Sequence, residues 1–509
     1  MILRLILGDQ LNYKHSWFSK KDESIIYLIM EMRQETDYVM HHAQKVIGFF
    51  AAMYNFSNYL TKAGHKVIHL KINDPENLHD LRKNLHQFIL KHRITQFEYQ
   101  WPDEYRLDIQ LQEFSKELVI PYKVYDTEHF LTKRDELANL FEGKKTYLME
   151  TFYRAMRKKH NIMMEGITPM GGKWNFDSDN RQTYKGEEKI PEPMVFKYDY
   201  SSILKEIDKQ KIKYFGNPMA DEFPWPTTRN QALQVLDFFT KKLLPLFGKY
   251  QDAMHTNYWS LYHSRLSFAL NIKMISPKEV IDAAIKSWQN NTAKISIEQI
   301  EGFVRQILGW REYMRGIYWA KMPEYATLNY FEHTEKLPIW FWNGNTKLNC
   351  LKYSIKQSLN FAYAHHIQRL MVIGNFALLA GVNPSEVDKW YLGIYIDAIE
   401  WAEITNTRGM SQFADAGIVG SKPYVSSANY IDKMSNYCKT CYYDKSKKTG
   451  ERACPFNSLY WNFYDKHTDK LSKNPRIGMM YNVWQKMAPT VKADILQQAD
   501  YYLKHINEL

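Results

Sequence analysis

The chain has 509 residues, with 67 Lys or Arg against 56 Asp or Glu and a formal net charge of +11. Its 45% hydrophobic and 24% charged content excludes a disordered protein, and its length indicates two or three domains. The positive balance favours a polyanionic partner such as nucleic acid. Aromatic residues make up 15% of the chain, but composition alone does not separate core packing from stacking on bases or flat cofactors.

The N-terminal sequence MILRLILGDQL is apolar only as far as Asp9. It lacks the apolar region and cleavage site of a signal peptide. The longest apolar stretch, MVIGNFALLAGV, has about twelve residues, too few to span a bilayer. We therefore expect a cytoplasmic protein without a membrane segment.

Residues 1–130 predict an α/β domain with a parallel, Rossmann-like sheet. The run 41–64 has a helical pattern that ends at Gly64. Because such runs alternate with β-rich ones, the pattern favours βαβ units, whose ligands bind beyond the carboxyl ends of the strands. No GxGxxG motif is present, so the usual dinucleotide fingerprint is absent. The β-rich runs are 3–9, 24–31, 65–72, 96–102 and 119–126.

The rest of the chain predicts a connector and a second domain. Residues 131–224 are rich in turn formers and read as an irregular connector. Residues 225–509 have helical periodicity almost to the end, which predicts a large all-α domain.

All four cysteines are candidate metal ligands. Cys438 and Cys441 form a C-x2-C pair, Cys454 follows with Pro455 after it, and Cys350 lies far upstream. Zinc ribbons usually have two C-x2-C pairs. One pair with two separate cysteines, one of them followed by proline, favours a [4Fe–4S] cluster, with zinc and no metal as the alternatives. Disulfides are not expected in the cytosol.

Several motifs together resemble the cryptochrome/photolyase superfamily. They are FVRQILGWREYMRG, HHIQRLMVIGNFALLAG and KWYLGIYIDAIEWAEITNTRGMSQFA in the helical half. With LGDQL at the start and the four cysteines, the chain resembles the iron–sulfur bacterial branch, the prokaryotic (6-4) photolyases. The resemblance covers nearly the whole chain.

The resemblance implies FAD in the helical domain, a 6,7-dimethyl-8-ribityllumazine antenna in the α/β domain and a [4Fe–4S] cluster. It implies blue-light-driven electron transfer from reduced flavin to a (6-4) lesion in UV-damaged DNA, flipped into a pocket above the flavin. We expect a monomer. Two alternatives remain: a blue-light sensor of the same fold, and a light-independent Fe–S protein that binds nucleic acid. A histidine pair over the flavin favours repair over sensing.

The resemblance also assigns catalytic residues. Arg369 and Asp397 match a pair beside the flavin ring that would stabilise its reduced anionic form. Glu403 takes the place where many photolyases have Asn opposite flavin N5. His365 and His366 match the proton donor to the lesion, a role that suits histidine because its charge changes near neutral pH. Tyr424 matches a position in the lesion pocket.

Further positions are assigned by the same resemblance. The electron relay from the surface would use aromatic side chains, namely Trp342, Trp390 and Tyr391, with Tyr430 as a further candidate. Contacts to FAD are expected from His263, Ser264, Leu266, Ser267, Gln306 and Arg311. Asp9, Met30, Glu31, Glu35 and Tyr38 are expected at the carboxyl ends of the first two strands, where a sheet of this kind binds its ligand, and the resemblance identifies that ligand as the antenna. A divalent cation such as Mg2+ would be held by Asp177 and Asp252, for which ordinary surface carboxylates are the alternative.

Overall fold

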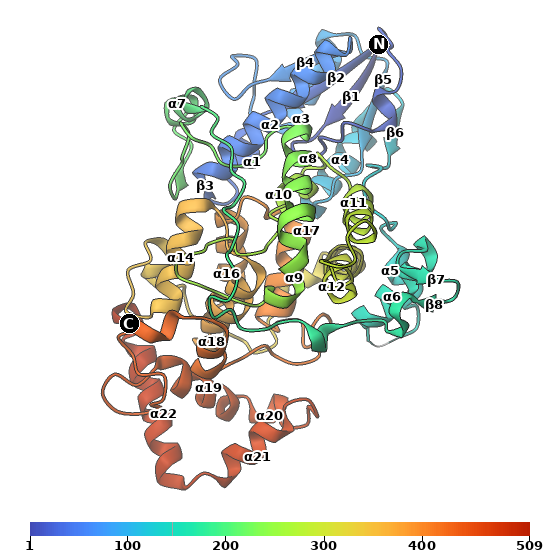
Figure 1. The fold of residues 1–509 in the computed structure, drawn as a ribbon. Helices are drawn as coiled ribbons and strands as arrows, with labels where there is room; N and C mark the ends of the chain where they lie inside the picture. Colours follow the sequence, from blue (N-terminus) through green and yellow to red (C-terminus); the bar gives the residue numbers. More distant parts are fainter. Residues whose placement is uncertain (145) are drawn as a thin grey trace.

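The computed structural model describes residues 1–144 and 146–509. A parallel five-stranded sheet occupies one end of the molecule, and helices make up most of the remainder (Figure 1). The strand order β4-β2-β1-β5-β6 confirms the predicted Rossmann-like domain, and every predicted β-rich run contains a strand. The strands are β1 (Ile2–Ile6), β2 (Ile25–Met30), β4 (Lys66–Leu70), β5 (Gln96–Gln100) and β6 (Tyr122–Tyr125).

Both faces of the sheet are buried. Along β2, Ile25, Tyr27 and Ile29 join one core, whereas the alternate residues of the strand join a second. This division follows from the two-residue repeat of a strand and explains why β2 reads as a continuous apolar run. The first core continues without a break into the helical part of the protein.

Helix α2 (Ala43–Lys62) begins at His42, whose ring accepts a hydrogen bond from the backbone of Gln44. The chain turns after it at Gly64, where φ is +88°, a conformation that favours glycine. The short helices of the domain are α1 (Arg33–Thr36), α3 (Leu81–Lys91) and α4 (Tyr105–Glu117).

The segment expected to be an irregular connector contains packed helices. Helix α6 (Met149–His160) lies against α13 (Glu312–Lys321) in the helical part, and α7 (Ser201–Lys209) lies against α2. Strand β9 (Tyr214–Phe215) pairs in parallel with β3 (His41–His42). The turn-rich sequence predicts the loops here but not the apolar faces that attach the segment to both domains.

From α8 (Arg229–Phe238) to α22 (Pro489–Lys504) the chain is helical, as expected. Besides η4 (Phe239–Leu243), three further π-helical segments interrupt it: η5 (Arg305–Arg311), η8 (Gln368–Gly374) and η9 (Thr405–Ser411). Such segments are rare and often mark functional sites. Each of these three further segments lies within or beside a sequence motif that carried the family resemblance. The helices around them are α10 (Ser267–Asn271), α12 (Ile297–Val304), α14 (Asn349–Phe361), α16 (Pro384–Ile394), α17 (Glu400–Ile404), α18 (Ala428–Met434) and α19 (Pro455–Lys466).

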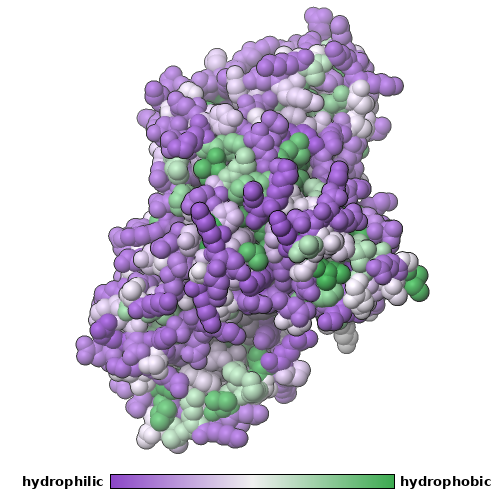
Figure 2. All heavy atoms as spheres, in the orientation of Figure 1, coloured by the Kyte–Doolittle hydropathy of each residue, from purple (hydrophilic) through white to green (hydrophobic). Residues whose placement is uncertain are grey.

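The surface is mostly hydrophilic, with small scattered apolar patches on the face that Figure 2 shows. Within the described residues, none of the helices combines the length and the apolarity that crossing a bilayer requires.

Candidate functional site

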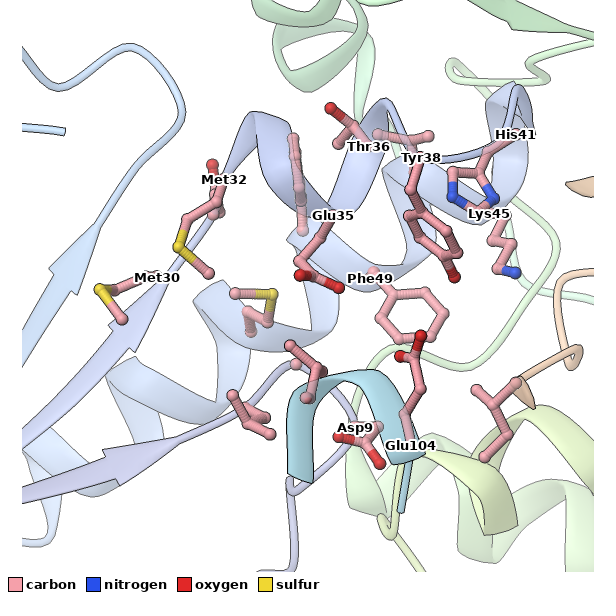
Figure 3. A pocket seen from close by; sticks show the side chains of 18 of the residues that line it. Asp9, Met30, Met32, Glu35, Thr36, Tyr38, His41, Lys45, Phe49 and Glu104 are labelled. Atoms are coloured by element: carbon pink, nitrogen blue, oxygen red, sulfur yellow. The ribbon is translucent and has the colours of Figure 1, made fainter. Parts of the chain in front are cut away.

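A pocket lies beyond the carboxyl ends of β1 and β2, where the sheet meets the helical part (Figure 3). We call it the sheet pocket. Its volume of about 140 Å³ is similar to that of engineered cavities that accept one aromatic ring. All five residues expected to contact an antenna line it: Asp9, Met30, Glu31, Glu35 and Tyr38.

Two of these carboxylates are held by the protein. Nζ of Lys273, from the helical part, lies 3.0 Å from Oδ2 of Asp9 and 2.9 Å from Oδ2 of Asp103. Glu31 accepts a hydrogen bond from the backbone of Ile72 and lies 3.0 Å from Nε2 of His69. Asp9 therefore joins the sheet domain to the helical domain, while Glu31 fastens two strand ends together.

Glu35 and Glu104 enter the sheet pocket from opposite sides (Figure 3). Arg106 binds both, donating to Glu35 at 2.8 and 3.1 Å and to Glu104 at 3.0 Å. Its guanidinium also lies 4.6 Å from the ring centre of Tyr38. Burial raises the pKa of Glu104 to about 8 against the opposing charge of Arg106, and the carboxylates of Glu35 and Glu400 act in the same direction as burial.

Sequence reasoning missed part of the wall of the sheet pocket. Asp103 and Glu104 follow β5, which pairs with β1, so the rule about strand ends that led to Asp9 could have found them. Residues 398–400 also line the pocket, but they come from the helical part, and no local pattern indicates that contact. Lys45, another missed residue, donates to the carbonyl oxygens of Leu392 and Ala398, both at 2.7 Å.

A second site forms around Arg369, on π-helical segment η8, and we call it the Arg369 site. Nη2 of Arg369 donates to both carboxylate oxygens of Asp397, at 3.0 and 3.2 Å. Ser267, at the start of α10, donates to the same carboxylate at 2.5 Å. The structure thus brings together three predicted residues from widely separated segments.

Histidines surround the Arg369 site. The rings of His263 and His365 stack with centres 4.4 Å apart. Burial lowers the pKa of His263 to about 3 and that of His365 well below its usual range, so both rings are neutral at neutral pH. Both ring nitrogens of His365 and Nε2 of His263 are buried without a hydrogen-bond partner in the described protein.

His366 is exposed to solvent. Nevertheless, burial by the surrounding protein, together with the charges of Arg369 and Arg181, lowers its pKa to about 4. These two observations agree if the imidazole faces solvent from within a recess. With no ligand beside it, the imidazole of His366 is neutral at pH 7. It becomes a proton source only when a neighbouring negative charge raises its pKa.

Glu403, on α17, is buried, and its Oε1 has no hydrogen-bond partner in the described protein. Burial and the nearby Asp388 carboxylate raise the pKa of Glu403 well above its ordinary value. This carboxyl group is therefore harder to ionise than that of an exposed glutamate, and its unpaired oxygen can take a hydrogen-bond partner.

The other residues predicted to contact FAD have different kinds of partners in the protein. Ser264 accepts a hydrogen bond from the backbone of Leu266 at 3.4 Å, and Gln306 donates to the carbonyl of Gly302 at 3.3 Å. Arg311 lies 4.9 Å from the ring centre of Trp401 and donates to the carbonyl of Leu270. The guanidinium of Arg311 thus already has an aromatic ring and a carbonyl oxygen as partners.

Three of the four predicted relay residues form a row. The hydroxyl of Tyr391 donates to the carbonyl of Arg369 at 2.6 Å, and the rings of Tyr391 and Trp390 are 5.4 Å apart. Trp390 lies 5.2 Å from Phe341, the neighbour of Trp342. Trp342 is 41% exposed, and Phe341 separates it from Trp390, so the row passes through a phenylalanine before it reaches the exposed tryptophan.

The hydroxyl of Tyr430, the fourth predicted relay residue, lies 3.5 Å from Oδ2 of Asp252. The two aspartates of the predicted cation site are both close to Arg181, which lies 3.1 Å from Asp177 and 3.9 Å from Asp252. A cation would therefore have to displace or join this arginine. Tyr424 is in the same group, since the charges of Arg181 and Asp177 both affect its pKa, which burial raises.

The four cysteines gather from three elements. Cys350 lies in α14, Cys438 and Cys441 lie in and directly after η10 (Tyr437–Thr440), and Cys454 precedes α19. Burial raises the pKa of Cys350 well above its usual value, and the charges of the other three thiols add to this effect. All four are free thiols. Within the described residues, however, no group of three or more His, Cys, Asp or Glu side chains is arranged to hold a metal ion.

The two sites share one stretch of backbone. Asp397 binds Arg369, residues 398–400 line the sheet pocket, and Glu403 follows one turn later. The carbonyl of Asp397 accepts a hydrogen bond from Asn271 at 2.7 Å, and the carbonyl of Ala398 accepts one from Lys45. Both ends of the shared stretch are therefore fixed.

Comparison with known proteins gives consistent results. The family described as "Deoxyribodipyrimidine photo-lyase-related protein" matches residues 4–225. The (6-4) photolyase of Agrobacterium fabrum is 39% identical over 510 residues, which cover 99% of each chain. Among solved structures, a bacterial class III photolyase from Agrobacterium tumefaciens has a TM-score of 0.56 at 14% identity and covers 96% of this chain and 98% of its own. A Synechocystis cryptochrome has a TM-score of 0.55 at 12% identity and covers 85% and 86%.

Proposed function

The chain belongs to the cryptochrome/photolyase superfamily, on the branch of the prokaryotic (6-4) photolyases, and on this premise we propose that it repairs (6-4) photoproducts in DNA with blue light. The observation that carries the proposal is the Arg369 site, where a charged pair lies beside buried histidines with unpaired ring nitrogens. The proposed enzyme acts as a monomer in the cytoplasm on UV-damaged DNA.

The residues of the Arg369 site fit FAD. Buried polar atoms in native proteins are nearly always paired, so the unpaired nitrogens of His263 and His365 and the free Oε1 of Glu403 require partners. A flavin supplies donors and acceptors along one ring edge and a pyrophosphate at its other end. When bound and reduced, FAD supplies the electron that light releases to the lesion.

The chain's own groups have distinct roles in this proposal. Arg369, kept in place by Asp397, holds positive charge beside the flavin. Neutral Glu403 offers a proton or hydrogen bond opposite the flavin ring. His366 faces solvent at the recess and would meet an extruded nucleotide. The negative charge of that nucleotide would raise the pKa of the imidazole, so that the ring becomes protonated and can then donate the proton.

The cysteines fit a [4Fe–4S] cluster better than zinc. Zn–S bonds of about 2.3 Å require four sulfurs to converge tightly on one point. A four-iron cluster is larger and holds its cysteines further apart, which suits a set in which three thiols raise the pKa of Cys350 without forming a single-ion site. Cys350, Cys438, Cys441 and Cys454 would be its ligands.

The sheet pocket would hold the antenna, 6,7-dimethyl-8-ribityllumazine. Its lining combines apolar side chains for a ring with carboxyl groups for ribityl hydroxyls. The group of Asp177, Asp252 and Arg181 would take a divalent cation such as Mg2+ only with movement of the arginine.

A defined substrate distinguishes repair from light sensing. The purified protein, loaded with reduced FAD, is illuminated with an oligonucleotide that carries one (6-4) photoproduct, and in parallel with one that carries a cyclobutane dimer. We expect restoration of intact pyrimidines in the first. A protein that binds FAD and undergoes photoreduction but restores neither substrate would instead be a blue-light sensor of the same fold. A protein without flavin absorption would be a light-independent nucleic-acid-binding protein.

A further inference from the structure

We propose that Glu104 determines the ligand specificity of the sheet pocket, by donating a hydrogen bond to an acceptor on the ring edge of an uncharged heteroaromatic ligand and by excluding phosphorylated ligands. The inference rests on the proposed antenna role of the pocket, but not on the DNA chemistry. Glu104 precedes α4, and its carboxyl group enters the sheet pocket opposite Glu35 (Figure 3).

The sheet pocket is lined by an excess of acidic groups. Six of its lining residues carry carboxyl groups, namely Asp9, Glu31, Glu35, Asp103, Glu104 and Glu400. These groups come from four different segments, so the excess belongs to the assembled fold and not to one acidic loop. A ligand phosphate would meet several acceptors that repel it.

The nearby cations are already engaged. Lys45 is the one Lys or Arg among the described residues that line the sheet pocket, and it donates to two carbonyl oxygens at 2.7 Å. Arg106 is bound to Glu35 and Glu104, and Lys273 to Asp9 and Asp103. A phosphate therefore finds no free cation here among the described residues, whereas hydroxyl groups find acceptors.

Glu104 differs from its neighbour Glu35 in its surroundings. Glu35 takes two hydrogen bonds from Arg106, while Glu104 takes one. Burial raises the pKa of Glu104 to about 8, against Arg106 and with Glu35 and Glu400, so the group is mostly protonated at pH 7. A protonated carboxyl group is a donor, and a ring carbonyl or ring nitrogen is its natural partner. The ionisable groups around it are Asp9, Glu35, Tyr38, His41, Lys45, Arg106 and Glu400.

The test measures ligand affinity by fluorescence titration of the FAD-loaded full-length protein. The probes are 6,7-dimethyl-8-ribityllumazine, riboflavin and riboflavin 5′-phosphate. We expect the lumazine to bind, and the phosphate to bind at least about tenfold more weakly than riboflavin. Glu104→Ala should weaken lumazine binding about tenfold at pH 7, the effect of one lost hydrogen bond. Glu104→Gln, which keeps a donor and has no charge, should bind nearly as tightly as the wild type.

The pH dependence of ligand affinity shows whether Glu104 acts as a hydrogen-bond donor or only fills space in the pocket. From pH 7 to 9.5 the wild type should lose about tenfold more affinity than Glu104→Gln, because Glu104 loses its proton and the amide does not. Ionisation of the ligand itself affects both proteins alike. Glu117→Gln, an exposed change on α4, is the control and should follow the wild type. Any one of three results would overturn the proposal. They are parallel pH profiles for the wild type and Glu104→Gln, equal affinity for riboflavin and riboflavin 5′-phosphate, and no lumazine binding. Repair under direct excitation of the flavin is scored separately, so a failure of the proposed function is recognised independently.

Discussion

Arg369 and Asp397 are 28 positions apart in the chain, yet one guanidinium nitrogen of Arg369 donates to both carboxylate oxygens of Asp397. The guanidinium also lies 3.8 Å from the ring centre of Tyr395. The pair is mostly buried, with side-chain exposures of 21% and 9%. Its geometry joins π-helical segment η8 to the backbone that leads into α17.

Removal of one partner of this pair should destabilise the folded protein. Arg369→Gln leaves Asp397 buried without its cation, for which we expect a loss of about 3 kcal/mol in the free energy of unfolding and a lower FAD content. Denaturant unfolding and the ratio of flavin to protein absorbance measure the two effects. The double variant Arg369→Gln/Asp397→Asn removes both charges and should recover part of the stability. If the single variant is as stable as the wild type, the pair has no structural role.

His366→Ala should separate repair from flavin chemistry. The histidine faces solvent, so its removal should leave folding, bound FAD and photoreduction unchanged while repair of the (6-4) substrate falls at least about a hundredfold, the typical worth of a general acid. Product analysis after illumination measures repair, and absorbance follows the flavin. Normal repair by this variant would exclude His366 as the proton donor.

Trp390→Phe should slow photoreduction of the flavin. The row from Tyr391 through Trp390 to Trp342 would lose its central tryptophan, and phenylalanine is much harder to oxidise. Repair that starts from chemically reduced flavin should not change. Trp340→Phe is the matched control, because Trp340 is equally buried and stacks on Phe341 but is not a member of the row. Equal photoreduction rates in the two variants would show that electrons take another path.

Cys441→Ser should lower both iron content and the yield of folded protein. Metal binding and folding are coupled when the ligands come from separate elements, as these four cysteines do. Iron and sulfide analysis of the purified variant, with Thr440→Ser as the neighbouring control, provides the measurement. A stable variant with no iron, or a wild type that contains zinc instead, would contradict the proposed cluster.

Acid should destabilise the protein through its buried histidines. His333 and His467 face each other, with their Nε2 atoms 3.2 Å apart, and burial lowers their pKa values to about 3 and about 4. In the unfolded chain a histidine has a pKa of about 6.5, so below that pH the unfolded state binds the additional protons. Stability from this source is constant above about pH 6.5 and falls as the pH drops towards 4.

The variant His467→Gln tests this effect. Each such histidine contributes a slope of up to about 1.4 kcal/mol per pH unit in that window. His467→Gln should therefore reduce the pH dependence of the unfolding free energy by about one proton, as measured by urea unfolding between pH 4 and 7. His86→Gln, an exposed change on α3, should have no effect on the slope. An unchanged slope in His467→Gln would show that this pair does not sense acid.

The elements that sequence reasoning predicted well are those with strong local patterns. Strand β2 is a continuous apolar run because both of its faces are buried, and α2 ends near a glycine with positive φ. Asp9 and Glu35 were predicted at the sheet pocket because their place follows from strand order alone.

The features that were not predicted depend on contacts between distant parts of the chain. Lys45 and Ala398 are 353 positions apart, so the role of residues 398–400 in the pocket wall has no local signal. The packed helices of the connector depend on partner surfaces in both domains. The contact between Tyr430 and Asp252 is likewise a matter of tertiary placement, because the two residues are 178 positions apart.

The backbone from Asp397 to Ala398 connects the Arg369 site directly to the sheet pocket. Asn271 holds its first carbonyl and Lys45 its second, so neither end can drift. With a chromophore on each side, the gap that excitation energy must cross would depend on this short stretch and on its contact with Lys45 of the sheet domain. Efficiency of energy transfer should therefore survive mild heating or high salt for as long as this short stretch keeps its two anchors.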